Sequence, residues 1–245
     1  VERKGIVIER WIGLGVGLAV PLSIYLGFEP TRGWELFFMT TAFLALFLAL
    51  SKRRHELLLL SRAPRSAEKS CRWLQGDTSD LPRLKKKIKT FDPEIFVHLA
   101  WSGIPDYSST MSKKNLDDSL RLMDFIIQET SCRKIVVTGT CFEYGRTLGR
   151  CRESDRTMTH SYLGWAKKSL YDYLECACAK KEIALVWFRL FYVYGPGQRD
   201  QALIPSALNA IREGRAPAVT YPNNANDYVH VNDVADAVAG AVRPG

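Results

Sequence analysis

The chain has 245 residues, of which 47% are hydrophobic and 24% charged, so it can bury a core and is neither disordered nor of low complexity. Lys and Arg total 34 against 26 Asp and Glu, a net charge of +8 that permits an acidic partner without choosing one. The six cysteines form no CxxC pair and no metal-ligand spacing with histidine, which argues against a zinc site or a disulfide scaffold. We therefore expect no metal site.

Two almost wholly apolar runs, residues 11–28 and 34–50, lie near the start of the chain. Each is about long enough to cross a ~30 Å hydrocarbon core at ~1.5 Å per residue. A short turn separates them and the basic run Ser51-Lys52-Arg53-Arg54 follows. This pattern predicts an apolar helical hairpin over residues 1–51 that spans the lipid bilayer through residues 11–50, with the rest of the chain in the cytoplasm. Alternatively, the second run is the buried first helix of an α/β domain.

From residue 56 onward, short apolar runs alternate with amphipathic segments, the form of a parallel sheet covered on both faces. The pattern predicts an α/β, Rossmann-like doubly wound sheet in a domain over residues 52–245. Strands are expected at residues 56–61, 72–75, 95–99, 134–138 and 184–189, and helices at residues 81–89, 116–127 and 167–180. The basic run Lys85-Lys86-Lys87 with Lys89 indicates the solvated face of a helix or, beside a membrane hairpin, a contact with anionic lipid.

Five stretches occur in the order typical of one superfamily. They are GDTSD from Gly76, HLAWSG from His98, GTCFEYG from Gly139, LGWAKKSL from Leu163, and RLFYVYGPGQ from Arg189 followed by LIPSALNAIREG and DYVHVNDVADAV. With these motifs, roughly residues 52 to 243 resemble the extended short-chain dehydrogenase/reductases, specifically the NAD-dependent epimerase/dehydratase group that acts on nucleotide-diphosphate sugars. The resemblance implies a nicotinamide cofactor and a nucleotide-sugar substrate.

The resemblance also implies a catalytic group of Thr140, Tyr162 and Lys167. Thr140 matches the family's Ser/Thr that hydrogen-bonds the substrate oxygen, and Lys167 matches the lysine that holds the nicotinamide ribose. A lysine is needed because a phenol with a pKa of about 10 is a poor base until a nearby cation favours the phenolate. Tyr162 would then be a displaced acid/base.

Further residues are implied in binding the cofactor and the substrate. Asp77 would lie beside the adenine, although alone it is typical of a turn or helix cap. Arg62, after the second strand, favours the 2′-phosphate of NADP, so the cofactor is expected to be NADP or NAD. The cofactor set is Arg62, Asp77, Ala100, Trp101, Lys167 and Tyr192. The substrate set is Tyr194, Leu203, Pro205, Asn226 and His230.

The sequence departs from the family pattern at three places. No glycine-rich fingerprint precedes Glu56, so the fold is expected to be incomplete at its first βα unit, which argues against tight dinucleotide binding. Tyr162 precedes Lys167 by five residues instead of four, a rotation of about 140° around a helix instead of about 40°. Asn226 stands where the family has an arginine that binds a substrate phosphate.

Two hypotheses follow. The first is a membrane-anchored protein resembling an NAD(P)-dependent nucleotide-sugar epimerase, dehydratase or reductase, with impaired or lost catalysis. The alternative is a non-catalytic accessory or scaffold subunit, with other subunits of a membrane complex as its partners. No recognition helix and no interleaving of aromatic and basic residues points to nucleic acid, so no nucleic-acid partner is expected.

Overall fold

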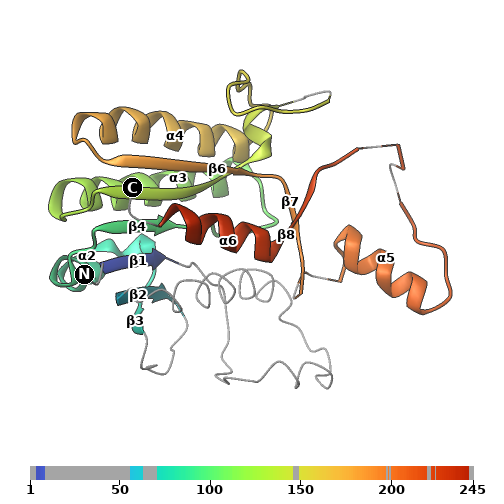
Figure 1. Ribbon diagram of the computed structural model, residues 1–245, viewed down its shortest axis with the longest axis horizontal. Coiled ribbons are helices and arrows are strands. Elements are labelled where there is room, and N and C mark those ends of the chain that lie inside the picture. Colours follow the sequence, from blue (N-terminus) through green and yellow to red (C-terminus); the bar gives the residue numbers. More distant parts are fainter. Residues whose placement is uncertain are drawn as a thin grey trace.

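The computed structural model describes residues 4–8, 56–62, 71–145, 149–196, 198, 200–219, 222–223 and 225–242. Its centre is a six-stranded parallel sheet in the order β3-β2-β1-β4-β5-β6 (Figure 1). The strands are β1 (Lys4–Ile8), β2 (Glu56–Ser61), β3 (Cys71–Gln75), β4 (Ile95–His98), β5 (Lys134–Thr140) and β6 (Ala184–Leu190). The five strands expected from residue 56 onward are confirmed, within a few residues at their ends. The strand order reverses beside β1, and open α/β sheets bind their ligands at such a point, in the crevice at the carboxyl ends of the strands.

Strand β1 corrects part of the expectation of an incomplete first βα unit, because the strand of that unit is present, while the residues that follow it lie outside the described part of the chain. It pairs in parallel with β2 on one side and with β4 on the other, so it occupies the middle of the sheet. Residues 1–51 therefore contribute a central strand to the α/β domain. The two apolar runs expected to form the hairpin, residues 11–28 and 34–50, lie outside the described residues. Within the described part of the chain, no helix is both long and apolar enough to cross a bilayer.

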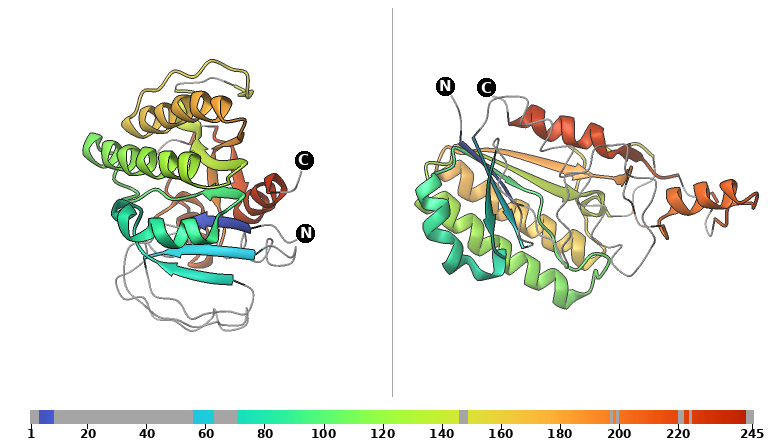
Figure 2. Two further views of the ribbon diagram at one scale, coloured as in Figure 1. Left: turned by 90° about the vertical axis from the view of Figure 1, so that its left-hand side faces the viewer. Right: turned by 90° about the horizontal axis from the view of Figure 1, so that it is seen from below.

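Helices cover both faces of the sheet. Helices α2 (Leu81–Phe91), α3 (Ser109–Glu129) and α4 (Tyr162–Lys180) lie on one face and α6 (Val231–Ala241) lies on the other (Figure 2). Alternate residues of β2 point to the two sides: Leu58 and Leu60 join the core under α2, α3 and α4, whereas Leu57 and Leu59 join the core under α6. Burial on both faces explains why the strands are continuously apolar.

A smaller unit extends from the carboxyl end of the sheet. Strands β7 (Tyr192–Tyr194) and β8 (Tyr228–His230) form a separate parallel pair. Helix α5 (Leu203–Arg212) projects away from the body of the molecule (Figure 2). The expected substrate residues therefore lie on this smaller unit and not on the six-stranded sheet.

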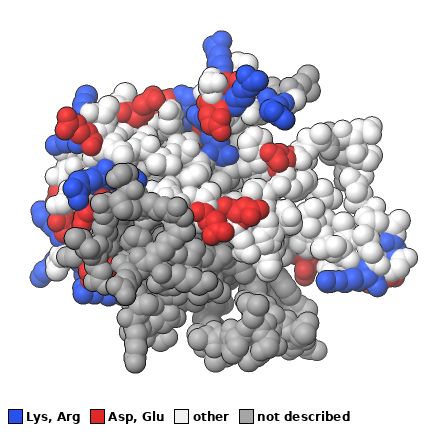
Figure 3. All heavy atoms as spheres, viewed as in Figure 1, with Lys and Arg blue, Asp and Glu red and all other residues white. Residues whose placement is uncertain are grey.

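The basic run on α2 is partly neutralised by the neighbouring helix. Lys85 and Lys89 place their Nζ atoms 3.1 and 3.3 Å from the two carboxylate oxygens of Glu129 on α3. On the face shown in Figure 3, basic and acidic side chains lie side by side around the sheet domain, and charged side chains also border the region of α5. These contacts favour the solvated-face interpretation of the run over the lipid-binding one.

Candidate functional site

The carboxyl ends of β4 and β5 bring Trp101 and Lys167 together, and Thr140 lies at the end of β5. Trp101 follows β4, Thr140 ends β5, and Lys167 reaches the sheet from α4. Trp101 is buried with Leu163 and Ala166 of α4, and Phe142 packs against them. The expected catalytic threonine and lysine thus lie at one edge of the sheet, where open α/β sheets bind their ligands.

Lys167 is a buried cation with few polar neighbours. Its side chain is 5% exposed, its Nζ donates a hydrogen bond of 2.6 Å to the carbonyl oxygen of Thr138, and it lies 4.3 Å from the centroid of the Trp101 ring. Burial lowers the pKa of Lys167 to about 8, because the charged form loses its hydration, while the charge of Glu143 acts in the opposite direction. A large fraction of this amine is therefore neutral near pH 8.

Glu143 is a fully buried carboxylate that the sequence did not single out. It belongs to the short 3-10 turn η4 (Cys141–Glu143) that follows β5. It accepts hydrogen bonds from the backbone N–H of Thr140 at 2.8 Å, from Trp187 Nε1 at 3.1 Å and from Arg189 Nε at 2.9 Å. The Thr140 side chain accepts from the N–H of Phe142 at 3.4 Å in the reciprocal half of a capping box. Glu143 thereby fixes the turn that carries Thr140.

Arg189 extends this network to the surface. Its guanidinium lies over the rings of Tyr144 and Tyr171, at 5.1 and 5.4 Å from their centroids. Its Nη1 also donates to the carbonyl oxygen of Glu153, in the segment that leads from η4 to α4. The sequence did contain a signal for the pair of Arg189 with Glu143. Arg189 is a charged residue inside the apolar strand ALVWFRL, and a charge in such a strand requires a buried partner.

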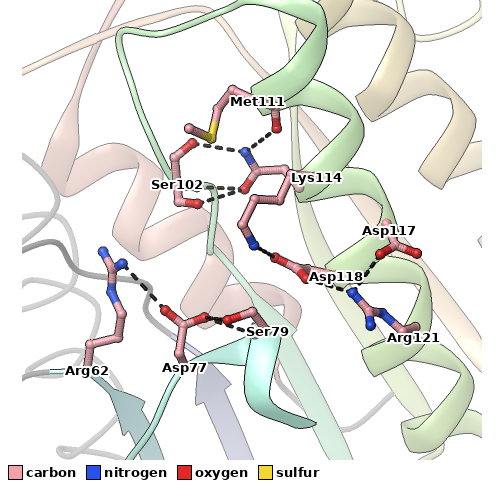
Figure 4. Close-up of polar contacts among 10 residues, drawn as sticks. Arg62, Asp77, Ser79, Ser102, Met111, Lys114, Asp117, Asp118 and Arg121 are labelled. Atoms are coloured by element: carbon pink, nitrogen blue, oxygen red, sulfur yellow. Dashed lines mark hydrogen bonds and ion pairs between the residues drawn. The ribbon is translucent and has the colours of Figure 1, made fainter.

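A buried amide side chain fixes the loop after β4. Asn115 of α3 accepts from the N–H of Ser102 at 2.8 Å and donates to the carbonyl oxygens of Ser102 and Met111, both at 2.9 Å (Figure 4). Ser102 directly follows Trp101, so these bonds hold the tryptophan against Lys167. Sequence reasoning missed Asn115 because the helix was expected to begin only at residue 116, whereas α3 begins at Ser109.

Tyr162 does not share a helix face with Lys167. Tyr162 is the first residue of α4 and is 56% exposed, whereas Leu163, four residues before Lys167, is 7% exposed and packs against Trp101. Ser161 caps the helix by accepting from the N–H of Gly164. A Cβ at Gly164 would lie 2.5 Å from the carbonyl oxygen of Phe142, so glycine lets α4 approach η4 closely. The tyrosine thus lies outside the group formed by Thr140, Trp101 and Lys167.

The expected cofactor residues Arg62 and Asp77 meet at the other side of the crevice. They follow β2 and β3, which are neighbours in the sheet. Arg62 Nη1 lies 3.4 Å from Asp77 Oδ2, and Asp77 Oδ1 accepts from the N–H and hydroxyl of Ser79 (Figure 4). Asp77 is therefore both a cap, as expected for the residue alone, and the partner of Arg62.

The expected substrate residues fall into two places. Tyr194 and His230 face each other across β7 and β8, with ring centroids 5.3 Å apart, and Tyr192 lies in the same way against Tyr228 at 5.6 Å. Asn226 is an exposed residue shortly before β8. Leu203 and Pro205 lie in the first turn of α5, away from the sheet (Figure 2). Among the described residues, no group of His, Cys, Asp or Glu could hold a metal ion.

Titration of Lys167 predicts how stability depends on pH. The pKa is lower in the folded chain than the ordinary 10.5, so the unfolded chain binds more protons between about pH 8 and 10.5, and the free energy of unfolding rises with pH in that window. We expect this free energy, taken as wild type minus Lys167→Met, to increase by about 2 kcal/mol from pH 7.5 to 9.5. Urea unfolding at both pH values measures it. The difference between variants removes the contributions of tyrosines and cysteines, and a flat difference would contradict the burial of the amine.

These features define a class of protein. A parallel sheet in the order β3-β2-β1-β4-β5-β6, covered by helices on both faces, is a Rossmann-like α/β domain, the fold in which many dinucleotide-binding proteins are built. The model of the NAD dependent epimerase/dehydratase family matches residues 44–244. The chain belongs to this family.

Similar proteins have low sequence identity to the chain. A probable dTDP-glucose 4,6-dehydratase of Sinorhizobium fredii is 24% identical over 76% of the chain, and the chain spans only 58% of that relative. The solved UDP-N-acetylglucosamine 4-epimerase of Methanobrevibacter ruminantium has a TM-score of 0.71 and 20% identity, covering 97% of this chain and 72% of its own. MoeE5, solved with UDP-glucuronic acid and NAD, has a TM-score of 0.67 and 24% identity, covering 85% and 70%. At these identities the solved structures support the fold alone.

Proposed function

We propose that the chain binds a nicotinamide dinucleotide and a nucleotide-sugar at the carboxyl edge of its sheet, with proton transfer impaired relative to its family. The observation that carries the proposal is the position of Leu163. A buried leucine lies four residues before Lys167, where a phenol would share the face of the lysine, while Tyr162 points to solvent. The remaining groups, Thr140 and Lys167, can hold a substrate oxygen and a ribose but supply no phenol between them.

The ligand classes are supported by the family and by its solved members. The chain belongs to an NAD dependent family, and a solved member of similar fold holds UDP-glucuronic acid and NAD. Aromatic rings at the mouth of the site, Tyr107 against Phe142 and Tyr192 against Tyr228, offer flat surfaces that suit a base or a sugar. When bound, the cofactor would supply hydride chemistry. In that complex, Lys167 would hold the nicotinamide ribose and Thr140 would orient the substrate oxygen.

Calorimetry on the full chain tests this proposal. NADP(H) and NAD(H) are titrated first, and UDP-glucuronic acid and dTDP-glucose follow in the presence of the tighter cofactor. We expect micromolar cofactor binding and sugar binding that strengthens when the cofactor is present, with only slow turnover. The absence of cofactor binding at millimolar concentration would overturn the proposal.

Arg62 is expected to select between the two dinucleotides. A guanidinium at the end of β2 can pair with the 2′-phosphate of NADP, and Asp77 already holds this group in place. Arg62→Ala should weaken NADP binding by about ten-fold to a hundred-fold, because a charge-assisted contact contributes roughly 1.5–3 kcal/mol. NAD binding should change much less. Equal losses for both dinucleotides would mean that Arg62 supports the fold and does not read the phosphate.

Membrane anchoring is a separate part of the proposal. It depends on the apolar runs 11–28 and 34–50 and on the basic residues that follow them. If these runs anchor the chain, it should stay with membranes after an alkaline carbonate wash, whereas release into the supernatant would exclude the anchor. The alternative role as a non-catalytic subunit is favoured by Leu163, because a leucine replaces the phenol four residues before Lys167. This role predicts that the chain co-purifies with partners in a fixed ratio.

A further inference from the structure

The amine of Lys167 is covered by its neighbours. The Lys167 side chain is 5% exposed, its Nζ donates a hydrogen bond of 2.6 Å to the carbonyl oxygen of Thr138, and the centroid of the Trp101 ring lies 4.3 Å from it. A hydroxyl group that bonds to this amine must come within about 3 Å of Nζ. A ligand therefore reaches Lys167 only after one of the groups that cover the amine has moved.

Of these two groups, the carbonyl is fixed by the sheet. Thr138 belongs to β5, which pairs with β4 on one side and with β6 on the other. Trp101 follows β4 in a stretch without helix or strand that leads to α3. Its ring can rotate about the side-chain bonds, whereas a backbone carbonyl inside a parallel sheet moves only together with its strand. The Trp101 ring is thus the part of the cover that can open.

Several contacts hold this ring in place. A tryptophan face within about 6 Å attracts a cation, and most strongly where water is excluded. Trp101 is 5% exposed and packs with Leu163 and Ala166 of α4. The backbone of the next residue, Ser102, is held by two hydrogen bonds with the Asn115 side chain. A ligand that needs the amine of Lys167 therefore competes with an arrangement that is already well stabilised.

We propose that the Trp101 ring competes with the ribose of the dinucleotide for the Lys167 amine, and that displacement of this ring sets the affinity for the cofactor. The inference rests on the proposed function, because it takes Lys167 as the residue that holds the nicotinamide ribose. When only a fraction of the molecules is competent to bind, the apparent affinity falls by that fraction. A chain whose amine is no longer covered should therefore bind the cofactor more tightly.

Calorimetry on the full chain with NAD and NADP measures the effect. Trp101→Ala removes the ring, and we expect it to bind the preferred dinucleotide at least about ten-fold more tightly than the wild type does. A gain of this size follows if about a tenth of the wild-type molecules or fewer are open. Trp101→Phe keeps a smaller ring that attracts a cation less strongly, so its affinity should lie between the other two. Equal affinities of the three chains would overturn the inference.

Trp165 provides the matched control. It lies on the same helix, two residues before Lys167, and so about 200° away from it around α4. Its side chain is 39% exposed, and it is not among the described residues of the cluster around Trp101. Trp165→Ala should therefore bind the dinucleotide as the wild type does. An equal gain in this variant would contradict a specific role of Trp101.

Fluorescence follows the ring without relying on the folding of Trp101→Ala. A buried indole that moves into water emits at longer wavelength, so NAD or NADP should shift the tryptophan emission of the wild type in that direction. The shift should be lost in Trp101→Phe and kept in Trp165→Phe. Cofactor binding to the wild type without any change in the emission of Trp101 would overturn the inference.

The outcomes separate this inference from the proposed function. If the wild type does not bind at millimolar cofactor but Trp101→Ala does, the inference stands and the proposed function of the wild type fails. If the wild type binds and removal of the ring does not tighten binding, the inference alone fails. If neither chain binds a dinucleotide, both fail.

Discussion

Replacing Glu143 with glutamine is expected to lower the free energy of unfolding by about 3 kcal/mol, because breaking a buried ion pair leaves the remaining charge uncompensated. Glu143 is fully buried and accepts three hydrogen bonds from N–H donors. In Glu143→Gln the amide nitrogen would face the N–H groups of Arg189 and Trp187 without accepting from them. Urea unfolding followed by circular dichroism gives the change.

Glu129→Gln is the matched control for this substitution. Glu129 also pairs with two cations, Lys85 and Lys89, but on the solvated surface between α2 and α3. Solvent screens such pairs, so this variant should unfold at nearly the same urea concentration as the wild type. Equal midpoints for both variants would show that the Glu143 network contributes nothing beyond a surface pair. Arg189→Met combined with Glu143→Gln should lose less than the sum of the two single losses.

Leu163→Tyr is expected to raise turnover of a nucleotide-sugar by at least about 100-fold, the usual contribution of a positioned acid or base. A residue four positions before Lys167 lies about 40° from it around α4, so the phenol would point toward the amine. The larger ring enters a site shared with Trp101 and Ala166, and overpacking should lower the free energy of unfolding by roughly 1–3 kcal/mol. Chromatographic separation of the nucleotide-sugar products, with UDP-glucuronic acid and dTDP-glucose as substrates, reports the gain.

Tyr162→Phe is the control for this experiment. The Tyr162 ring is 56% exposed and lies about 140° from Lys167, so removing its hydroxyl should leave both turnover and the unfolding midpoint unchanged. If Tyr162→Phe instead abolishes a measurable wild-type activity, then Tyr162 is the acid/base and the proposal of impaired proton transfer is wrong.

The sequence predicted the strands and helices that can be recognised from one continuous stretch of residues. The apolar runs of β2, β4, β5 and β6 and the helices between them are continuous patterns of strand or helix type, and all of them occur in the structure. The sequence also singled out Thr140, which ends β5, and Lys167, whose Nζ bonds to Thr138 of the same strand; their catalytic roles stay predictions.

The features that the sequence did not predict depend on contacts between residues far apart in the chain. Strand β1 is five residues long, and nothing within KGIVI distinguishes a central strand from a piece of a helix; its pairing with β2 and β4 makes the difference. The partners of Glu143 likewise lie 44 and 46 residues away, at Trp187 and Arg189. A pattern within a short stretch of sequence does not reveal such contacts, although the charge of Arg189 within β6 indicated that a buried partner was needed.

The central position of β1 also has a consequence for how the protein is made. Lys4 pairs with Glu56 and Gly5 with Ile95, so the middle strand is synthesised before both of its neighbours and stays unpaired until they have followed. Non-local pairing of this kind closes slowly and leaves a strand with two unpaired edges in the nascent chain. Strand β1 is therefore the part of the sheet that most needs protection from other chains during synthesis.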